Sequence, residues 1–305
     1  HVLLACQDFK LGFELSEWRW KTVERKGTLL QSPKSIWKGE INKRVLVWGE
    51  QGIGDEIMFS SMVPELCKIA STVMLHCDER LIPLFKRSFP ANVEYSIRSE
   101  GVRSLNYDFH IPIGSLANTF RTSRESFRAT STGFLNHNQR RADQLRETIL
   151  SRGAKKIIGM GWNTSSALRD ASKRNIKLSD LAQSLASTNT QLVSLQYGDV
   201  DEEITRLKND HGIDVMQMTE IDNKNDMDGL AALIMACDEV VSTTNAMVHL
   251  AGALGASTKV LLPFAPRWIW GNGSESFWYD SVIPYKQEQP GDWVNVLKSF
   301  TIDNI

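Results

Sequence analysis

The stretch RVLVWGEQGIGDEIMFSSMVPELCKIA, residues 44–70, sets the pattern for most of the chain. It opens with a short apolar, β-branched run (Arg44–Glu50), which predicts a strand, and passes through a glycine-containing turn into a helical pattern (Glu56–Ala70). Further strands are expected at Thr72–Cys77, Val93–Ile97 and Tyr107–Ile113, and further helices at Glu79–Ser88 and Arg140–Arg152. Strands that alternate with helices predict a parallel sheet covered on both faces.

The alternation restarts at Lys156 and continues nearly to the end of the chain. Strands are expected at Lys156–Trp162, Gln191–Tyr197, Ile213–Met218, Glu239–Thr243 and Lys259–Phe264, and helices at Leu178–Ser187, Asp201–Asp210, Met227–Ala236 and Ala246–Gly255. A length of 305 residues also fits two domains of ordinary size. We therefore predict an α/β chain with two successive parallel-sheet domains.

The two ends of the chain differ from this pattern. Residues Ala5–Lys21 predict an amphipathic helix, with a break possible at Gly12, that must pack on a neighbour. Residues 24–40 are polar and contain Gly and Pro, as linkers do. Seven of the nine tryptophans lie near the ends, and we interpret them as anchors for the terminal segments. Trp268 and Trp270, just after a strand end, are the one pair kept as a candidate surface for stacking on a ligand.

Composition excludes several classes of protein. The formal net charge is −1, so the chain carries no global charge pattern for nucleic acid or an anionic membrane. The longest apolar runs are far shorter than a transmembrane helix needs. Four scattered cysteines without a C-x-x-C pair favour a reducing compartment, so we expect a cytoplasmic protein. The first residue is His1 rather than Met, from which we expect a fragment of a longer chain. No histidine spacing typical of metal sites is present.

The first candidate site loop is GEQGIGDE, residues 49–56. Its glycines, Gly52 and Gly54 among them, let the backbone turn tightly and approach a ligand. The order G-x-x-G-x-G is neither a dinucleotide fingerprint nor an NTPase phosphate loop. Asp55 is either the N-cap of the following helix or a carboxylate that faces the cleft.

Two further loops follow predicted strands of the second domain, where ligands bind in open parallel sheets. In residues 162–175, small polar residues and the cations Lys173 and Arg174 suit a diphosphate, although a solvated surface loop fits equally well. In residues 242–255, Thr243, Thr244 or Asn245 would cap a helix whose free N–H groups form an anion site. His249 lies one turn inside that helix and, taken alone, is more often a structural residue.

These loops together resemble a known family. The segments GEQGIGDEIMFSSMVPEL, SLQYGD, VVSTTNAMVHLAGALG and LLPFAPRWIWGNGSESFWYDSVIPYKQEQPGDW are similar to the glycosyltransferase region of bacterial tetratricopeptide-repeat proteins. That region is related to the heptosyltransferases, which have the GT-B fold. The opening FKLGFELSEWRW resembles the closing helix of a tetratricopeptide array. The resemblance covers most of the chain.

The resemblance implies two Rossmann-like domains facing across a cleft. It divides the chain into a repeat remnant and linker (1–40), an acceptor domain (41–153), a nucleotide-sugar donor domain (154–286) and a C-terminal helix that returns to the first domain (287–305). It implies an inverting, metal-independent transfer without a cofactor, with the nucleotide sugar as substrate. Upstream repeats would recruit an acceptor polypeptide or glycan.

The resemblance also assigns roles to residues of this sequence. Asp55 would be the general base, which takes the proton from the acceptor hydroxyl. Many relatives have Asp-Thr where this chain has Thr244 and Asn245, so a role that needs that carboxylate is in doubt. The donor and its diphosphate would contact Gly52, Gly54, Trp162, Asn163, Thr164, Ser165, Lys173, Arg174, Gln196, Thr244, Asn245, Ala246, Met247 and His249.

Two other readings keep the same fold. One is a non-catalytic nucleotide-binding interaction module, and the other is a sugar-nucleotide epimerase or hydrolase.

Overall fold

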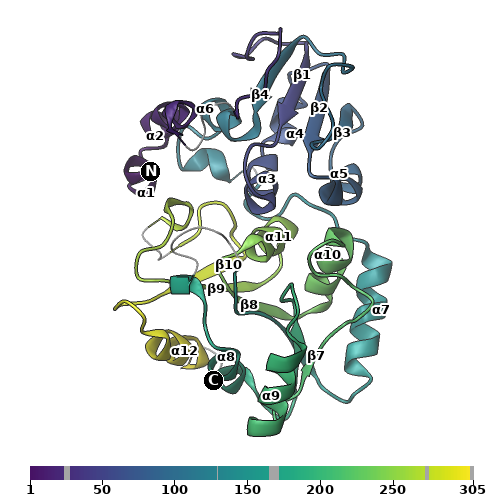
Figure 1. Ribbon diagram of the computed structural model, residues 1–305, viewed down its shortest axis with the longest axis vertical. Helices are drawn as coiled ribbons and strands as arrows, with labels where there is room; N and C mark the ends of the chain where they lie inside the picture. Colours follow the sequence, from purple (N-terminus) through teal and green to yellow (C-terminus); the bar gives the residue numbers. More distant parts are fainter. Residues whose placement is uncertain (24–27, 129, 165–171, 272–274, 303–305) are drawn as a thin grey trace. The chain divides into compact units, whose positions relative to one another are not determined.

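The computed structural model describes residues 1–305 except 24–27, 129, 165–171, 272–274 and 303–305. The chain forms two compact units. Unit 1 comprises His1–Thr130 and Phe134–Asn136, and unit 2 comprises Ser131–Gly133 and His137–Ile305. Each unit is built on its own parallel sheet, as the alternating pattern predicts (Figure 1).

Unit 1 contains a four-stranded sheet in the order β3-β2-β1-β4, in which all neighbours are parallel. The strands are β1 (Arg44–Trp48), β2 (Thr72–Cys77), β3 (Val93–Ile97) and β4 (Phe109–Pro112). The helices that follow β1 are α3 (Ile53–Ser60) and α4 (Val63–Leu66), and the others are η3 (Glu79–Leu81), α5 (Ile82–Ser88), η4 (Ile113–Leu116), α6 (Ala117–Phe120) and η5 (Glu125–Phe127). Strand β1 lies in the middle because its residues Val45–Val47 are apolar on both faces and fully buried.

The N-terminal residues pack within unit 1 as α1 (Val2–Ala5), α2 (Phe9–Ser16) and the 3₁₀ helix η1 (Glu17–Lys21). The helix continues through Gly12, and the break lies instead before α2, where Gln7 has φ of 65°. Gly12 is a packing position, since a Cβ there would lie 2.6 Å from Leu4 Cδ2. Phe9, three residues before Gly12, is also buried, with its ring centroid 4.8 Å from that of Phe127.

Unit 2 contains a six-stranded parallel sheet in the order β10-β9-β8-β5-β6-β7. The strands are β5 (Lys156–Gly161), β6 (Thr190–Ser194), β7 (Val215–Met216), β8 (Glu239–Thr243), β9 (Thr258–Leu262) and β10 (Val282–Lys286). The helices are α7 (Gln139–Leu150), η6 (Ser172–Arg174), α8 (Leu178–Leu185), α9 (Asp201–His211), α10 (Met227–Ala236), α11 (Ala246–Leu254), η7 (Trp268–Trp270) and α12 (Trp293–Ile302). The sequence analysis missed β10, an edge strand that contains Pro284 and leaves Ile283 exposed.

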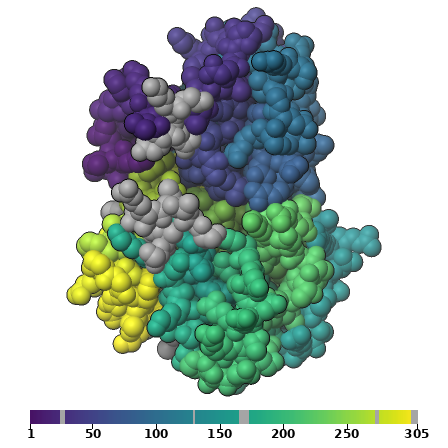
Figure 2. All heavy atoms as spheres, in the orientation of Figure 1, coloured from purple at the N-terminus to yellow at the C-terminus, as the bar shows by residue number. Residues whose placement is uncertain are grey.

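The structure differs from the expected boundaries in two places, both of which enlarge unit 2. Helix α7 packs on α10 through Ala142, Leu145 and Ile149, so it belongs to unit 2 rather than closing the first domain. The segment 287–305 was expected to return to the first domain. Its helix α12 packs instead on α8 and β10, because Val296 and Leu297 are buried in the core of unit 2 (Figure 2, yellow).

Most of the tryptophans near the ends pack within their own units, but Trp18, which is 60% exposed, is no anchor. Trp20 lies 5.5 Å from Trp48 between ring centroids, and Trp37 is buried in unit 1. In unit 2, Trp270 and Trp278 are buried, and Trp293 packs against the core. Among the described residues, no helix is long and apolar enough to cross a membrane.

Candidate functional site

The glycine loop of unit 1 connects β1 to α3, and Gly52 rather than Asp55 is the N-cap of that helix. Asp55 is the third helical residue, with its N–H donating to the Gly52 carbonyl at 3.0 Å. Its side chain is partly exposed, as is Gly54 beside it. The structure thus places Asp55 in the first helical turn beyond the carboxyl end of β1, where the helix dipole stabilises a carboxylate.

Glu56, which the sequence analysis did not single out, is the buried acid of this loop. It is fully buried and accepts a hydrogen bond from the Asp78 N–H at 2.8 Å, and it forms an ion pair with Arg98. Burial raises the pKa of Glu56 to about 7, against the opposing effects of the Asp78 N–H and Arg98. The sequence carried no signal for Glu56, because its partners, the Asp78 N–H and Arg98, are distant in sequence.

A pocket of about 270 Å³ opens beside the glycine loop, at the carboxyl ends of β1 and β2. Its lining includes Trp48, Glu50, Gln51, His76 and Arg98. Burial and Arg98 hold the pKa of His76 below its ordinary value, so His76 is neutral at physiological pH. A lining rich in hydrogen-bonding side chains suits a hydroxyl-rich molecule.

In unit 2, the loop after β5 is held by carboxamides. Gln196 accepts hydrogen bonds from the N–H groups of Trp162 (3.1 Å) and Asn163 (2.9 Å), and Asn175 accepts one from Thr164 (2.9 Å). The Trp162 ring is a core residue, 1% exposed, whose Nε1 donates to Glu203 at 2.9 Å. The backbone of Trp162 is also engaged, since its N–H donates to Gln196 and its carbonyl accepts from the Ile176 N–H at 3.0 Å. The Asn163 side chain, in contrast, is exposed.

The loop after β8 leads into α11, and Asn245 is its N-cap. Asn245 Oδ1 accepts from the N–H groups of Met247 (3.0 Å) and Val248 (3.3 Å). Within the described residues, the N–H groups of Asn245 and Ala246 make no hydrogen bond, which leaves them for an anion. The Met247 N–H, which the resemblance had assigned to the diphosphate, serves the cap instead.

Arg174 brings a cation to this helix start. Its side chain is buried, and its Nη1 lies 3.4 Å from the Thr244 carbonyl. Lys173, the neighbouring cation, is exposed. The loops after β5 and β8 therefore meet at adjacent strand ends, and one of them supplies a charge that complements a phosphate. Ser165, the remaining predicted residue of the β5 loop, lies outside the described residues.

His249 is a structural residue. Its ring stacks on Trp270 with centroids 5.5 Å apart, and its Nδ1 lies 3.2 Å from the Tyr279 hydroxyl. Burial, reinforced by Arg267, lowers the pKa of His249 to about 3, so it carries no charge at neutral pH. A neutral His249 offers a diphosphate no positive charge, and its predicted contact with the donor stays a prediction. Trp270, 1% exposed and donating to Thr244 Oγ1 at 3.0 Å, is likewise no sugar-stacking surface.

A second pocket, of about 150 Å³, lies at the carboxyl ends of β6 and β7. Gln196, Met218, Asn223 and Ser194 line it, and Ser194 is 2% exposed with no hydrogen-bond partner for its hydroxyl among the described residues. A small pocket with a thioether and a few polar atoms suits a flat heterocycle such as a nucleobase.

Comparisons with known proteins agree with the fold. No family model matches the chain. FlbA of Caulobacter vibrioides is 30% identical over 310 residues, a match that covers 96% of this chain and 52% of FlbA. The chain thus spans about half the length of the curated relative that it matches.

Solved structures with the same fold include glycosyltransferases. A family 9 glycosyltransferase from Veillonella parvula matches with a TM-score of 0.59 at 13% identity, covering 86% of this chain and 90% of that chain. The Escherichia coli ADP-heptose lipopolysaccharide heptosyltransferase II matches with a TM-score of 0.58 at 12% identity, covering 86% and 99%. E. coli heptosyltransferase WaaC, solved with ADP-2-deoxy-2-fluoro heptose, matches with a TM-score of 0.52 at 14% identity, covering 86% and 100%. Both parallel-sheet units therefore belong to the GT-B-like fold of these enzymes.

Proposed function

We propose that the chain is a glycosyltransferase that moves a sugar from a nucleotide-sugar donor to a hydroxyl acceptor. The observation that carries this proposal is a group of features at the carboxyl ends of the strands in the unit 2 sheet. There, the capped start of α11, Arg174 and the small pocket all lie at carboxyl ends of neighbouring strands. The fold shared with heptosyltransferases supports the same reading.

The spacing of these features fits a nucleoside diphosphate. The strand order β8-β5-β6-β7 places the anion site at one end of this row and the small pocket at the other. Because the pocket lies at the ends of both β6 and β7, the separation is two to three strand spacings, about 10–14 Å, a span that an extended nucleoside diphosphate can bridge. The diphosphate would bind the N–H groups of Asn245 and Ala246 with Arg174, and the base would enter the pocket beside Ser194.

We assign Asp55 as the general base and the pocket beside Trp48 as the acceptor subsite. The Asp55 carboxylate would take the proton of the acceptor hydroxyl while the hydroxyl oxygen of the acceptor bonds to the anomeric carbon of the donor sugar. The bond from that carbon to the diphosphate would break in the same step. Positive groups at the start of α11 would stabilise the departing diphosphate. The chain needs no metal for these steps in this proposal, and repeats elsewhere in the full-length protein would recruit the acceptor.

The test is transfer from a panel of nucleotide sugars, in EDTA, by the wild type and by Asp55→Asn. We expect Asp55→Asn to lower the transfer rate at least about 100-fold, because general-base catalysis contributes on that scale. Binding of the nucleoside diphosphate, measured by calorimetry, should change little. Full activity in Asp55→Asn would contradict the assignment of the base.

Other outcomes of the same panel separate the alternative functions. Nucleotide binding without consumption of any donor would favour a non-catalytic interaction module. Consumption of the donor without a glycosylated acceptor would favour an epimerase or hydrolase. A requirement for added divalent metal would overturn the metal-independent mechanism.

A further inference from the structure

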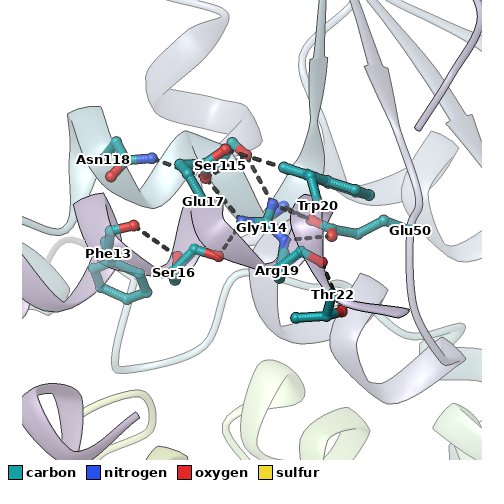
Figure 3. Close-up of polar contacts among 10 residues, drawn as sticks. All are labelled: Phe13, Ser16, Glu17, Arg19, Trp20, Thr22, Glu50, Gly114, Ser115 and Asn118. Carbon is teal, nitrogen blue, oxygen red and sulfur yellow. Dashed lines mark hydrogen bonds and ion pairs between the residues drawn. The ribbon is translucent and has the colours of Figure 1, made fainter. Parts of the chain in front are cut away.

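Glu50, in the glycine loop, is a buried carboxylate with a well-defined set of donors (Figure 3). Its side chain is 1% exposed. It accepts hydrogen bonds from Arg19 Nε at 2.8 Å, from Arg19 Nη2 at 2.9 Å and from the Gly114 N–H at 3.0 Å. The two contacts to Arg19 are the bidentate arrangement in which a guanidinium binds a carboxylate most strongly.

The guanidinium of Arg19 is itself held on its other side. Its Nη1 donates to Glu17 at 2.8 Å and to the Ser16 carbonyl at 3.2 Å, and its Nη2 donates to Ser115 Oγ at 2.8 Å. Glu17 also accepts from Ser115 at 2.7 Å and from Asn118 at 3.1 Å. The network in Figure 3 therefore fixes Arg19 between the N-terminal helices and the glycine loop.

An aromatic contact supports the same junction. The Trp20 ring lies 5.5 Å from that of Trp48, the last residue of β1, and the Arg19 guanidinium lies 4.5 Å from the Trp20 ring centroid. Residues 17–21 are thus packed against the strand end from which the loop of Asp55 starts.

We propose that Arg19 is a positioning residue through which the N-terminal helices hold the glycine loop, residues 49–56, in the conformation that presents Asp55. This inference rests on the proposed function. A loop with glycines at 49, 52 and 54 is costly to order by itself. A buried carboxylate in that loop requires a partner, and Arg19 supplies it from a segment outside the sheet. Small displacements of a catalytic group have large effects on rate.

The experiment compares Arg19→Met, Glu50→Gln and the double variant in the full chain. Transfer kinetics and amide hydrogen exchange over residues 49–56 are measured for each. We expect Arg19→Met to lower kcat about tenfold or more, with the KM for the donor changed less than about threefold, and to speed exchange across 49–56. The double variant should be no worse than Arg19→Met, because the two residues act as a pair. Arg19→Lys, which keeps the charge, should restore part of kcat.

The matched control is Arg44→Met, which removes an ion pair to Glu94 at 2.8 Å from the opposite end of the same strand β1. It should leave kcat and the exchange of 49–56 unchanged. Effects of Arg19→Met no larger than those of this control would overturn the proposal. If the wild type transfers no sugar, exchange alone decides: faster exchange at 49–56 supports the positioning role, and unchanged exchange refutes it.

Discussion

Glu56 shows how one residue makes the stability of unit 1 depend on pH. Its pKa is about 7 in the folded chain, above the ordinary value of 4.5, because burial disfavours the charged form. The folded state therefore binds a proton more tightly than the unfolded state. Protonated Glu56 therefore contributes to the free energy of unfolding. This contribution is complete below about pH 4.5 and is lost as the pH rises to about 7.

We predict that Glu56→Gln removes this dependence. The free energy of unfolding of the wild type, relative to that of Glu56→Gln, should fall by on the order of 3 kcal/mol between pH 4.5 and pH 8. Urea unfolding at several pH values measures the difference. Glu94→Gln, at an exposed glutamate of β3, is the control and should follow the wild type. A constant difference between the wild type and Glu56→Gln across this range would refute the prediction.

At the scale of single residues, the sequence was sufficient to identify the glycine loop, residues 49–56, but not the roles of the residues within it. Asp55 and Glu56 are adjacent acids, and only the position of the Gly52 cap decides which of them turns toward the sheet. His249 was predicted one turn inside the helix after Asn245, but the burial that neutralises it involves Trp270 and Tyr279, which are distant in sequence. Contacts of this kind depend on tertiary packing and leave no local pattern.

At the scale of elements, the start of α11 combines a structural and a binding role. Asn245 caps the helix with a neutral oxygen and leaves the charge of the anion site positive. We predict that Asn245→Asp keeps the thermal stability, because Asp is an equally good cap. The same substitution should weaken binding of nucleoside diphosphates about tenfold, since it places a negative charge beside the phosphates. Thermal melting and calorimetry with ADP, GDP, UDP and CDP provide the two measurements.

Asn245→Ala separates the two effects. It should cost about 1 kcal/mol of stability through the lost cap, yet it should bind diphosphates better than Asn245→Asp does. If Asn245→Asp binds as tightly as the wild type, the diphosphate does not lie at the start of α11.

The elements themselves were the most predictable part of the structure. Strands β2 and β8 and helix α10 have the expected bounds because each is a largely buried run with clear ends. Strand β3 has the expected bounds as well, although only Val93 is buried. The continuous helix expected over Glu56–Ala70 is instead two short helices, with Pro64 at the start of the second. Strand β10 escaped prediction because an edge strand lacks a regular apolar pattern.

At the scale of the whole molecule, the sequence predicted two parallel-sheet units but misplaced the boundary between them. A helix that follows the last strand of unit 1 was assigned to unit 1, because consecutive elements usually pack together. The apolar face of α7 fits α10 instead, a helix about 80 residues further along the chain. Arg146 reinforces the contact by donating to the Ala236 carbonyl at 2.8 Å and to Asp238 at 2.7 Å. Sequence spacing cannot show which of two sheets a helix will cover.

This boundary leads to a prediction about fragments of the chain. A fragment of residues 131–305 retains α7 and should fold with a cooperative thermal transition and bind nucleoside diphosphates. A fragment of residues 154–305, cut at the boundary expected from the sequence, exposes the face of α10 that Leu145 and Ile149 cover. We expect it to aggregate or melt at a lower temperature. In the full chain, Leu145→Ala should cost about 2–5 kcal/mol and lower the melting temperature of unit 2, whereas truncating the exposed Glu147 to Ala should not. Equal stability of the two fragments would show that α7 is dispensable to unit 2.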